Sequence, residues 1–193
     1  MLQPDVILAS TSPFRKALLA KLGIPFQVQS PQIDETPLEN ETAHELVSRL
    51  AQAKAEAIGR LHDQAIIIGS DQVCSVDGLI LGKPGNAENA IAQLTRLSGR
   101  LVRFETGLCL YQGMRHQTVV EAFDVKFRTL SQQQIQRYVE IEQPYHCAGS
   151  FMSEGLGICL FEHFAGRDPN TLIGLPLMAL TDLLADWGIS LPL

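Results

Sequence analysis

Residues 6–19, VILASTSPFRKALL, combine a short apolar run, a group of small residues and a strong helix start. Ser12 is a favoured N-cap residue and Pro13 fits the first helical position, so the stretch predicts a strand, a tight loop and a helix. Arg15 and Lys16 then place two cations in the first helical turn, where the helix dipole favours acidic groups or a bound anion. The sequence therefore predicts that this turn receives an anion.

The composition predicts one soluble domain. The chain has 193 residues, of which 46% are hydrophobic and 19% charged, enough to bury one substantial core. Its net charge of -6 argues against a broad basic surface for duplex nucleic acid. The 4 cysteines are scattered without disulfide or zinc-ligand spacing. Neither a signal peptide nor a membrane span is expected, and free thiols indicate a cytoplasmic location.

Strand-like and helix-like patterns alternate along the chain and predict a mixed α/β fold. Strands are expected at 6–9, 26–29, 65–70, 73–76 and 79–81, and helices at 13–22, 42–61, 86–97, 131–141 and 177–187. A long hairpin is expected between 101–111 and 117–127, and a glycine-rich strand region between the last two helices. These hairpins argue against an all-parallel sheet.

A lysine interrupts the apolar face of the helix expected at 42–61. At about 100° per residue, Lys54 falls on the face formed by Ala43, Leu46, Val47, Leu50, Ala57, Ile58 and Leu61. Two interpretations stay open. Lys54 either extends to the edge of the core or meets a carboxylate there, or the helix lines a cleft in which Lys54 reaches a bound anion.

Four further charged residues, in three segments, are candidates for a site. Asp71 follows the buried strand expected at 65–70, and ligands collect beyond the carboxyl ends of such strands, although an aspartate there also serves as a turn former or cap. The loop IDETP carries Asp34 and Glu35 ahead of a proline, and LGKPG holds Lys83 between glycine and proline. In each loop alone, a solvated turn is the simpler interpretation.

Together these groups indicate phosphoryl chemistry. Amides and hydroxyls at a helix start bind a phosphate, cationic side chains neutralise the rest of a polyphosphate, and carboxylates hold a divalent ion that bridges phosphate oxygens. This combination also fits a net-acidic protein. The anion expected at Arg15 is then the phosphate of a nucleotide.

Several ordered segments resemble the Maf-like nucleoside triphosphate pyrophosphatases over essentially the whole chain. They are LASTSPFRKALL, IDETP, LVSRLAQAKAEA, IIIGSDQV, GKP, LSGR, AGSFMSEGLG and NTLIGLPL. The resemblance implies a single domain over residues 1–193, with an elongated, mixed and twisted sheet, flanking helices and two lobes around a cleft, similar to the inosine triphosphatases. It implies hydrolysis of the bond between the α and β phosphates with a divalent cation. Many members are cytoplasmic homodimers, and the same assembly is an option here.

The resemblance also implies roles for individual residues. Asp71 would prepare the attacking water as general base or metal ligand, and Glu35 matches the second acidic position, so both are candidate ligands of Mg²⁺, Mn²⁺ or Co²⁺. The groups implied around the triphosphate are Ser10, Ser12, Arg15, Lys54 and Lys83, of which the two lysines are also catalytic candidates. The sequence does not divide the roles of Asp34 and Glu35.

Three departures from the commoner dTTP/UTP pyrophosphatase pattern resemble the bacterial subgroup that acts on 7-methyl-GTP: Phe14, Gln72 and Glu154, the last within HCAGSFMSEG. N7-methylguanine is cationic, so an aromatic ring such as Phe14 gains cation-π attraction. A carboxylate such as Glu154 accepts hydrogens from the N1 and N2 edge of guanine. The expected substrate is therefore 7-methyl-GTP.

Two alternatives remain. A broader pyrophosphatase would take dTTP, UTP or CTP. A non-catalytic nucleotide-binding regulator of cell division would not need Asp71, Glu35 and two site lysines together.

Overall fold

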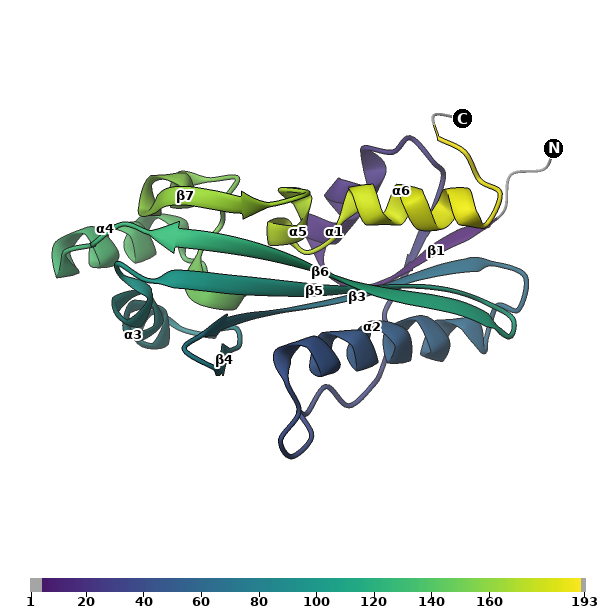
Figure 1. Cartoon of the computed structure of the whole chain (residues 1–193), viewed down its shortest axis with the longest axis horizontal. Helices are drawn as coiled ribbons and strands as arrows, with labels where there is room; N and C mark the ends of the chain where they lie inside the picture. Colours follow the sequence, from purple (N-terminus) through teal and green to yellow (C-terminus); the bar gives the residue numbers. More distant parts are fainter. Residues whose placement is uncertain (1–4, 192–193) are drawn as a thin grey trace. The chain divides into compact units, whose positions relative to one another are not determined.

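The computed structural model describes residues 5–191 and contains one mixed sheet flanked by helices (Figure 1). The sheet order is β2-β1-β3-β5-β6-β7, and β4 pairs with β3. The strands are β1 Val6–Ala9, β2 Gln27–Gln29, β3 Ile66–Val76, β4 Leu79–Leu81, β5 Leu101–Gln112, β6 Arg115–Phe127 and β7 Phe161–Gly166. The helices are α1 Pro13–Ala20, α2 Ala43–Gly59, α3 Ala87–Leu97, α4 Gln132–Glu142, α5 Asn170–Ile173 and α6 Leu177–Asp186, with short 3₁₀ helices at Ala148–Ser150 and Leu156–Leu160.

The chain divides into two compact units. The first contains the chain up to Asp71, Thr106–Glu121 and the chain from Asp168 onward, and the second contains Gln72–Glu105 and Ala122–Arg167. No helix within residues 5–191 has both the length and the apolar character that a membrane crossing requires.

Helices cover both faces of the sheet in the first unit. β1 pairs in parallel with β2 and with β3, so its alternating side chains enter two separate cores. Leu8 and Ile68 pack with α1 and α6 on one face, whereas Ile7 and Ile67 pack against α2 on the other. Figure 1 shows α6 and α2 on these opposite faces. This two-sided burial explains why β1 and the start of β3 are continuous apolar runs.

The second unit has an aromatic core. Phe104, Phe127, Phe151 and Phe161 form edge-to-face pairs with ring centroids between 4.7 and 5.6 Å apart. In the same unit, β3 and β4 form the predicted antiparallel hairpin, with positive φ at Asp77 and Gly78 in its turn. The aromatic pairs and this hairpin both lie within the second unit.

The structure confirms most predicted elements and corrects two. The strand predicted at 65–70 was expected to end before Asp71, but β3 continues to Val76, so Asp71 lies within a strand. The reason is a change of partner, because β3 pairs with β1 up to Gly69 and with β4 from Cys74 onward. In the region predicted as glycine-rich strand, two 3₁₀ helices precede the strand β7.

Close packing of α2 on β3 depends on a glycine. A Cβ atom built on Gly69 would lie 2.8 Å from the amide nitrogen of Ala55 and 2.9 Å from its Cβ, and closer still to the carbonyl oxygen of Ala51. Since two of these atoms belong to the helix backbone, the helix would have to move to admit a methyl group.

We predict that Gly69→Ala lowers the free energy of unfolding by about 1–3 kcal/mol because it overpacks this contact. Urea denaturation followed by circular dichroism measures the change. Gly82→Ala is the matched control, since a Cβ there would meet nothing within 4 Å. Equal unfolding midpoints for the Gly69 variant and the wild type would show that α2 adjusts freely.

Candidate functional site

A buried lysine joins two carboxylates in the first unit. The Lys54 ammonium lies 2.6 Å from Asp71 Oδ1 and 2.9 Å from Glu35 Oε1. Lys54 is 5% exposed and Asp71 7%, whereas the Glu35 side chain is 55% exposed. A buried ammonium needs such partners, because its desolvation is costly unless it is paired. Of the two interpretations of Lys54, contact with a carboxylate is therefore observed, and binding of an anion stays a prediction.

Different kinds of structure present the three groups. α2 begins with a capping box in which Thr42 and Glu45 bond each other's backbone amides, so the helix that carries Lys54 has a fixed start. Asp71 lies in β3 just past the segment paired with β1. Glu35 comes from a loop without helix or strand. The lysine and one carboxylate are thus held by regular structure, and the second carboxylate is held by a loop.

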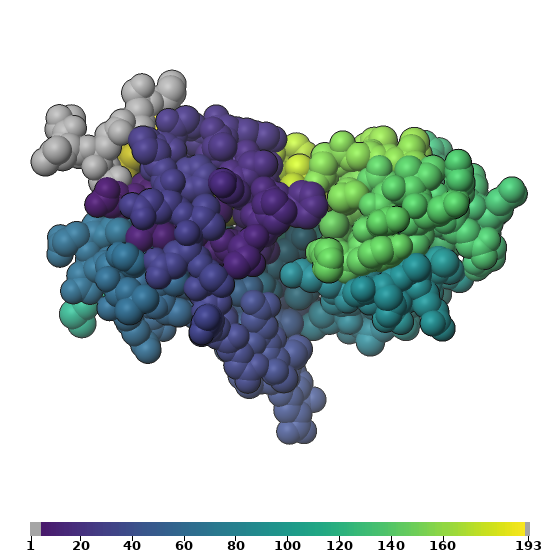
Figure 2. Space-filling view, turned by 180° about the vertical axis from the view of Figure 1, so that it is seen from behind, coloured from purple at the N-terminus to yellow at the C-terminus, as the bar shows by residue number. Residues whose placement is uncertain are grey.

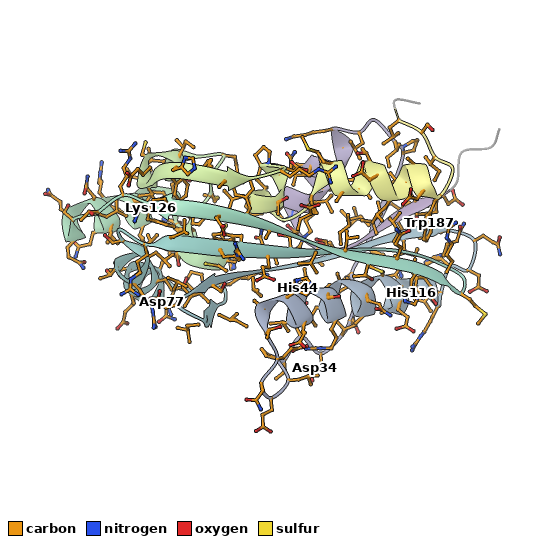
Figure 3. The ribbon with its side chains drawn as sticks, viewed as in Figure 1. Asp34, His44, Asp77, His116, Lys126 and Trp187 are labelled. Atoms are coloured by element: carbon orange, nitrogen blue, oxygen red, sulfur yellow. The ribbon has the colours of Figure 1, made fainter. Side chains whose placement is uncertain are left out.

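The structure separates the roles of Asp34 and Glu35. Asp34 Oδ1 accepts a 2.9 Å hydrogen bond from the Thr36 amide, which makes a local turn, and hydrogen bonding from Thr36 lowers the Asp34 pKa. Glu35 instead extends to Lys54. Figure 3 shows Asp34 in the loop that precedes α2. Asp34 therefore shapes the turn, and Glu35 is the carboxylate that joins the cluster.

Arg15 lies in the field of the same carboxylates. Ser12 caps α1 by accepting a 3.3 Å bond from the Arg15 amide, as predicted. The Arg15 Nε donates a 2.7 Å bond to the carbonyl oxygen of Gly174. Burial lowers the pKa of Arg15, while the charges of Asp71 and Glu35 raise it. Because the ordinary pKa of arginine is so high, the guanidinium stays charged near neutral pH.

The other serine of the α1 loop is also engaged. Ser10 is buried, and its Oγ accepts a 3.1 Å bond from the Ser12 amide. Both predicted serines therefore stabilise the loop at the start of α1. Their contact with a phosphate stays a prediction.

Sequence reasoning missed one polar residue beside Asp71. Ser70 is fully buried, and its Oγ donates a 3.0 Å bond to the Gly174 carbonyl oxygen that also accepts from Arg15. Gly174 has a φ of 115°, which favours glycine. Ser70 and Gly174 are 104 positions apart along the chain. In the sequence, the only sign of a role for Ser70 is a hydroxyl at the end of an apolar run.

The remaining candidates belong partly to the second unit. The first unit contains Ser10, Ser12, Phe14, Arg15, Glu35, Lys54 and Asp71, and the second contains Gln72, Lys83 and Glu154. Lys83 and Glu154 are exposed, and the charges of both act on the thiol of Cys147. Burial is the main cause that raises the pKa of Cys147 to about 11. Lys83 and Glu154 therefore lie in the neighbourhood of one thiol that is protonated at neutral pH.

The carboxylate pair fits a hard divalent cation held partly by substrate. Among residues 5–191, no three His, Cys, Asp or Glu side chains gather as a metal cluster. Glu35 and Asp71 nevertheless share one cationic partner at hydrogen-bond distance. Mg²⁺ is commonly bound by one or two carboxylates, with waters and substrate phosphates completing the shell. Two oxygen donors that already face one positive charge match this pattern.

Two solved structures resemble the fold. The Ham1 protein of Staphylococcus aureus matches with a TM-score of 0.55 and 15% identity, covering 95% of this chain and 99% of that one. A HAM1 protein from Coxiella burnetii matches with a TM-score of 0.52 and 15% identity, covering 95% and 100%. At this identity the likeness concerns the fold alone, and it supports the predicted α/β class.

Sequence relatives are much closer. A protein of Pseudoalteromonas atlantica named 7-methyl-GTP pyrophosphatase is 59% identical over 186 residues, 95% of each chain. One of Vibrio vulnificus with the same name is 55% identical over 187 residues, 96% of each chain. The family model described as Maf-like protein matches residues 5–187. The resemblance seen in the ordered motifs is confirmed, and the chain belongs to the Maf family.

Proposed function

We propose that this protein is a metal-dependent nucleoside triphosphate pyrophosphatase that hydrolyses 7-methyl-GTP to 7-methyl-GMP and diphosphate. The observation that carries the proposal is the cluster in which Lys54 contacts Asp71 and Glu35, with Arg15 in the field of both carboxylates. Relatives at 55% and 59% identity are named for this activity. A binding module would not need a buried lysine paired with two carboxylates.

The side chains of the cluster have complementary roles in this proposal. A divalent ion held by Asp71 and Glu35 would supply charge neutralisation at the phosphate oxygens. Lys54 and Arg15 neutralise further charge on the triphosphate, and Ser10, Ser12 and the amides at the start of α1 bind a phosphate. Asp71 accepts the proton of the attacking water, for which its position on a strand provides a fixed geometry. The family resemblance alone assigns Lys83 to the triphosphate.

Three residues are assigned to the base. Phe14 stacks on the cationic N7-methylguanine, and Glu154 accepts hydrogen bonds from the N1 and N2 edge of the base. Gln72 is the third position at which the sequence differs from the dTTP/UTP pyrophosphatases. Phe14 is half-buried on α1, and Glu154 is exposed, so both retain surface for a ligand. The names of the two relatives support the same substrate.

The proposal extends to the whole protein. Residues 1–193 act as a single Maf-like domain, in the cytoplasm, with a nucleotide as the ligand and with Mg²⁺, Mn²⁺ or Co²⁺ as the cofactor. A homodimer is the assembly that the family resemblance favours. Duplex nucleic acid and membranes are not proposed as partners.

We expect the purified protein to release diphosphate from 7-methyl-GTP in Mg²⁺, Mn²⁺ or Co²⁺, and to act far more slowly on dTTP, UTP and CTP. Asp71→Asn removes the proposed base and should lower turnover by about 10²- to 10⁴-fold. The control is Asp63→Asn, an exposed position in the same unit. Faster cleavage of dTTP or UTP would favour the broader enzyme, and tight binding without turnover would favour the regulator.

We expect Glu154→Gln to lower kcat/KM for 7-methyl-GTP by about 10- to 100-fold, because a hydrogen bond to a charged group contributes about 1.5–3 kcal/mol. Hydrolysis of 7-methyl-GTP and GTP should be compared in the same assay. Glu162→Gln, an exposed glutamate of the same unit, is the control. GTP carries the same N1 and N2 edge, so a loss on both substrates fits this role. If neither substrate is cleaved more slowly, Glu154 does not bind the N1 and N2 edge of the base.

We expect Lys54→Met to bind Mn²⁺ at least about 10-fold more tightly than the wild type without nucleotide, because one competing charge leaves the two carboxylates. Turnover should fall at the same time. Electron paramagnetic resonance measures free Mn²⁺, and thermal unfolding verifies that the variant is folded. Lys21→Met, with its exposed contact to Asn170, is the control. Weaker Mn²⁺ binding in the Lys54 variant would contradict a metal site at Asp71 and Glu35.

A further inference from the structure

Apolar packing holds the loop that carries Glu35 only in part. Residues 30–41, the Glu35 loop, contain no helix or strand. Of its two large aliphatic side chains, Ile33 is partly buried and Leu38 is 60% exposed. An open hollow of about 700 Å³ is lined by residues 38–41 and by side chains of α2. Figures 1 and 2 show the segment around residue 40 projecting from the first unit. Polar interactions must therefore help to fix the path of the loop beside Glu35.

Arg49 of α2 supplies such interactions. Its Nε donates to Glu41 Oε1 at 2.6 Å, and its Nη2 donates to Glu41 Oε2 at 2.7 Å. The same Nη2 donates to the carbonyl oxygen of Thr36 at 3.2 Å, directly after Glu35 in the chain. One guanidinium thus holds the loop at two points, and a bidentate pair of this kind restricts orientation as well as distance.

Glu41 is itself enclosed and well bonded. Its side chain is only 6% exposed, and Oε2 also accepts a 2.9 Å bond from the Leu38 amide. The hydrogen bond from Arg49 is the main cause that lowers the Glu41 pKa to about 2, so the carboxylate is ionised at any pH near neutral. The contact between Arg49 and Glu41 therefore persists across the working range of an enzyme.

We propose that Arg49 and Glu41 are positioning residues that hold the Glu35 carboxylate at Lys54, and thereby complete the two-carboxylate site. The inference rests on the proposed function, because it assigns the loop a role in metal binding. Arg49 contacts the chain just after Glu35, and the Asp34 turn shapes the chain just before it. The half-exposed Glu35 is thus fixed on both sides, although no part of its loop is regular structure.

A neighbouring ion pair on the same helix provides a comparison. Arg60 and Glu56 are four residues apart and share one 3.0 Å bond at the end of α2. Such a pair connects the helix to itself and contributes little. Arg49 and Glu41 instead connect the helix to the loop ahead of its N-cap. Arg60→Lys is therefore the matched control for Arg49→Lys, because both substitutions keep the positive charge and remove the planar guanidinium group with its paired N–H donors.

The experiment measures hydrogen-deuterium exchange of residues 30–41 and Mn²⁺ affinity in the wild type, Arg49→Lys, Arg60→Lys, Glu35→Gln and the Arg49→Lys/Glu35→Gln double variant. We expect faster exchange in the Glu35 loop only where Arg49 is changed. Arg49→Lys should also weaken Mn²⁺ binding by about 10- to 100-fold, the usual effect of losing a group that orients a ligand. In the Glu35→Gln background it should weaken Mn²⁺ binding no further, because Arg49 acts through Glu35.

Unchanged loop exchange in Arg49→Lys overturns the proposal, and so does an additive loss of Mn²⁺ affinity in the double variant. A lower thermal midpoint with unchanged Mn²⁺ affinity would show a structural role only. The proposed function is tested by a different assay, and it fails if the wild-type protein does not release diphosphate from 7-methyl-GTP. In that case loop exchange and Mn²⁺ affinity still decide whether Arg49 and Glu41 position Glu35.

Discussion

The contact of the Lys54 ammonium with Asp71 and Glu35 is the interaction on which the rest of the first unit depends. Lys54 is only 5% exposed, and a buried ammonium is stable only with charged partners. α2 must therefore lie close enough to β3 for the side chain to meet Asp71. Small residues provide that proximity. Gly69 faces Ala51 and Ala55 with no room for a methyl group. Gly69, two residues before Asp71, therefore allows the close approach of α2 that the ion pair requires.

The cluster is also balanced in charge. Lys54 and Arg15 are cationic, and Asp71 and Glu35 are anionic, so the four groups nearly cancel within one region. In the proposed function, a divalent ion would add positive charge beside the carboxylates, and a triphosphate would add negative charge beside the lysine and arginine. Each would favour the binding of the other, because the positive charge of the ion attracts the negative charge of the triphosphate. A region with low solvent exposure strengthens this coupling, since charges interact more strongly away from water.

Short-range sequence patterns correctly predicted features that depend on neighbouring residues, such as a helix start and a charged residue on an apolar helix face. Ser12 and Pro13 marked the start of α1, and Lys54 was conspicuous because it broke an apolar periodicity. The end of the strand before Asp71 was predicted wrongly, because β3 exchanges one partner strand for another and no residue in it signals the exchange.

Contacts between segments that are far apart in the sequence could not be predicted from hydrophobic periodicity. Ser70 and Arg15 share the Gly174 carbonyl oxygen across more than a hundred positions. Arg49 and Glu41 are eight residues apart, with one inside the helix and the other ahead of its cap, so helical spacing does not pair them. The roles of Asp34 and Glu35 also required coordinates, because either neighbour could have formed the turn. In each case the deciding feature is the path of the backbone between the partners.

The two carboxylates of the cluster differ in how firmly they are held, and this difference suits a site that must exchange cations. Asp71 is fixed in a strand and nearly buried, whereas Glu35 is half-exposed on a loop that the Arg49 fork holds to α2. In the proposed function, Lys54 would turn from the carboxylates toward a phosphate, while Asp71 would keep its place and Glu35 would adjust by the small movement that a loop allows. A site with two rigid carboxylates would resist that exchange, and one with two mobile carboxylates would lose the geometry that a small hard cation demands. One fixed and one tethered carboxylate meet both requirements.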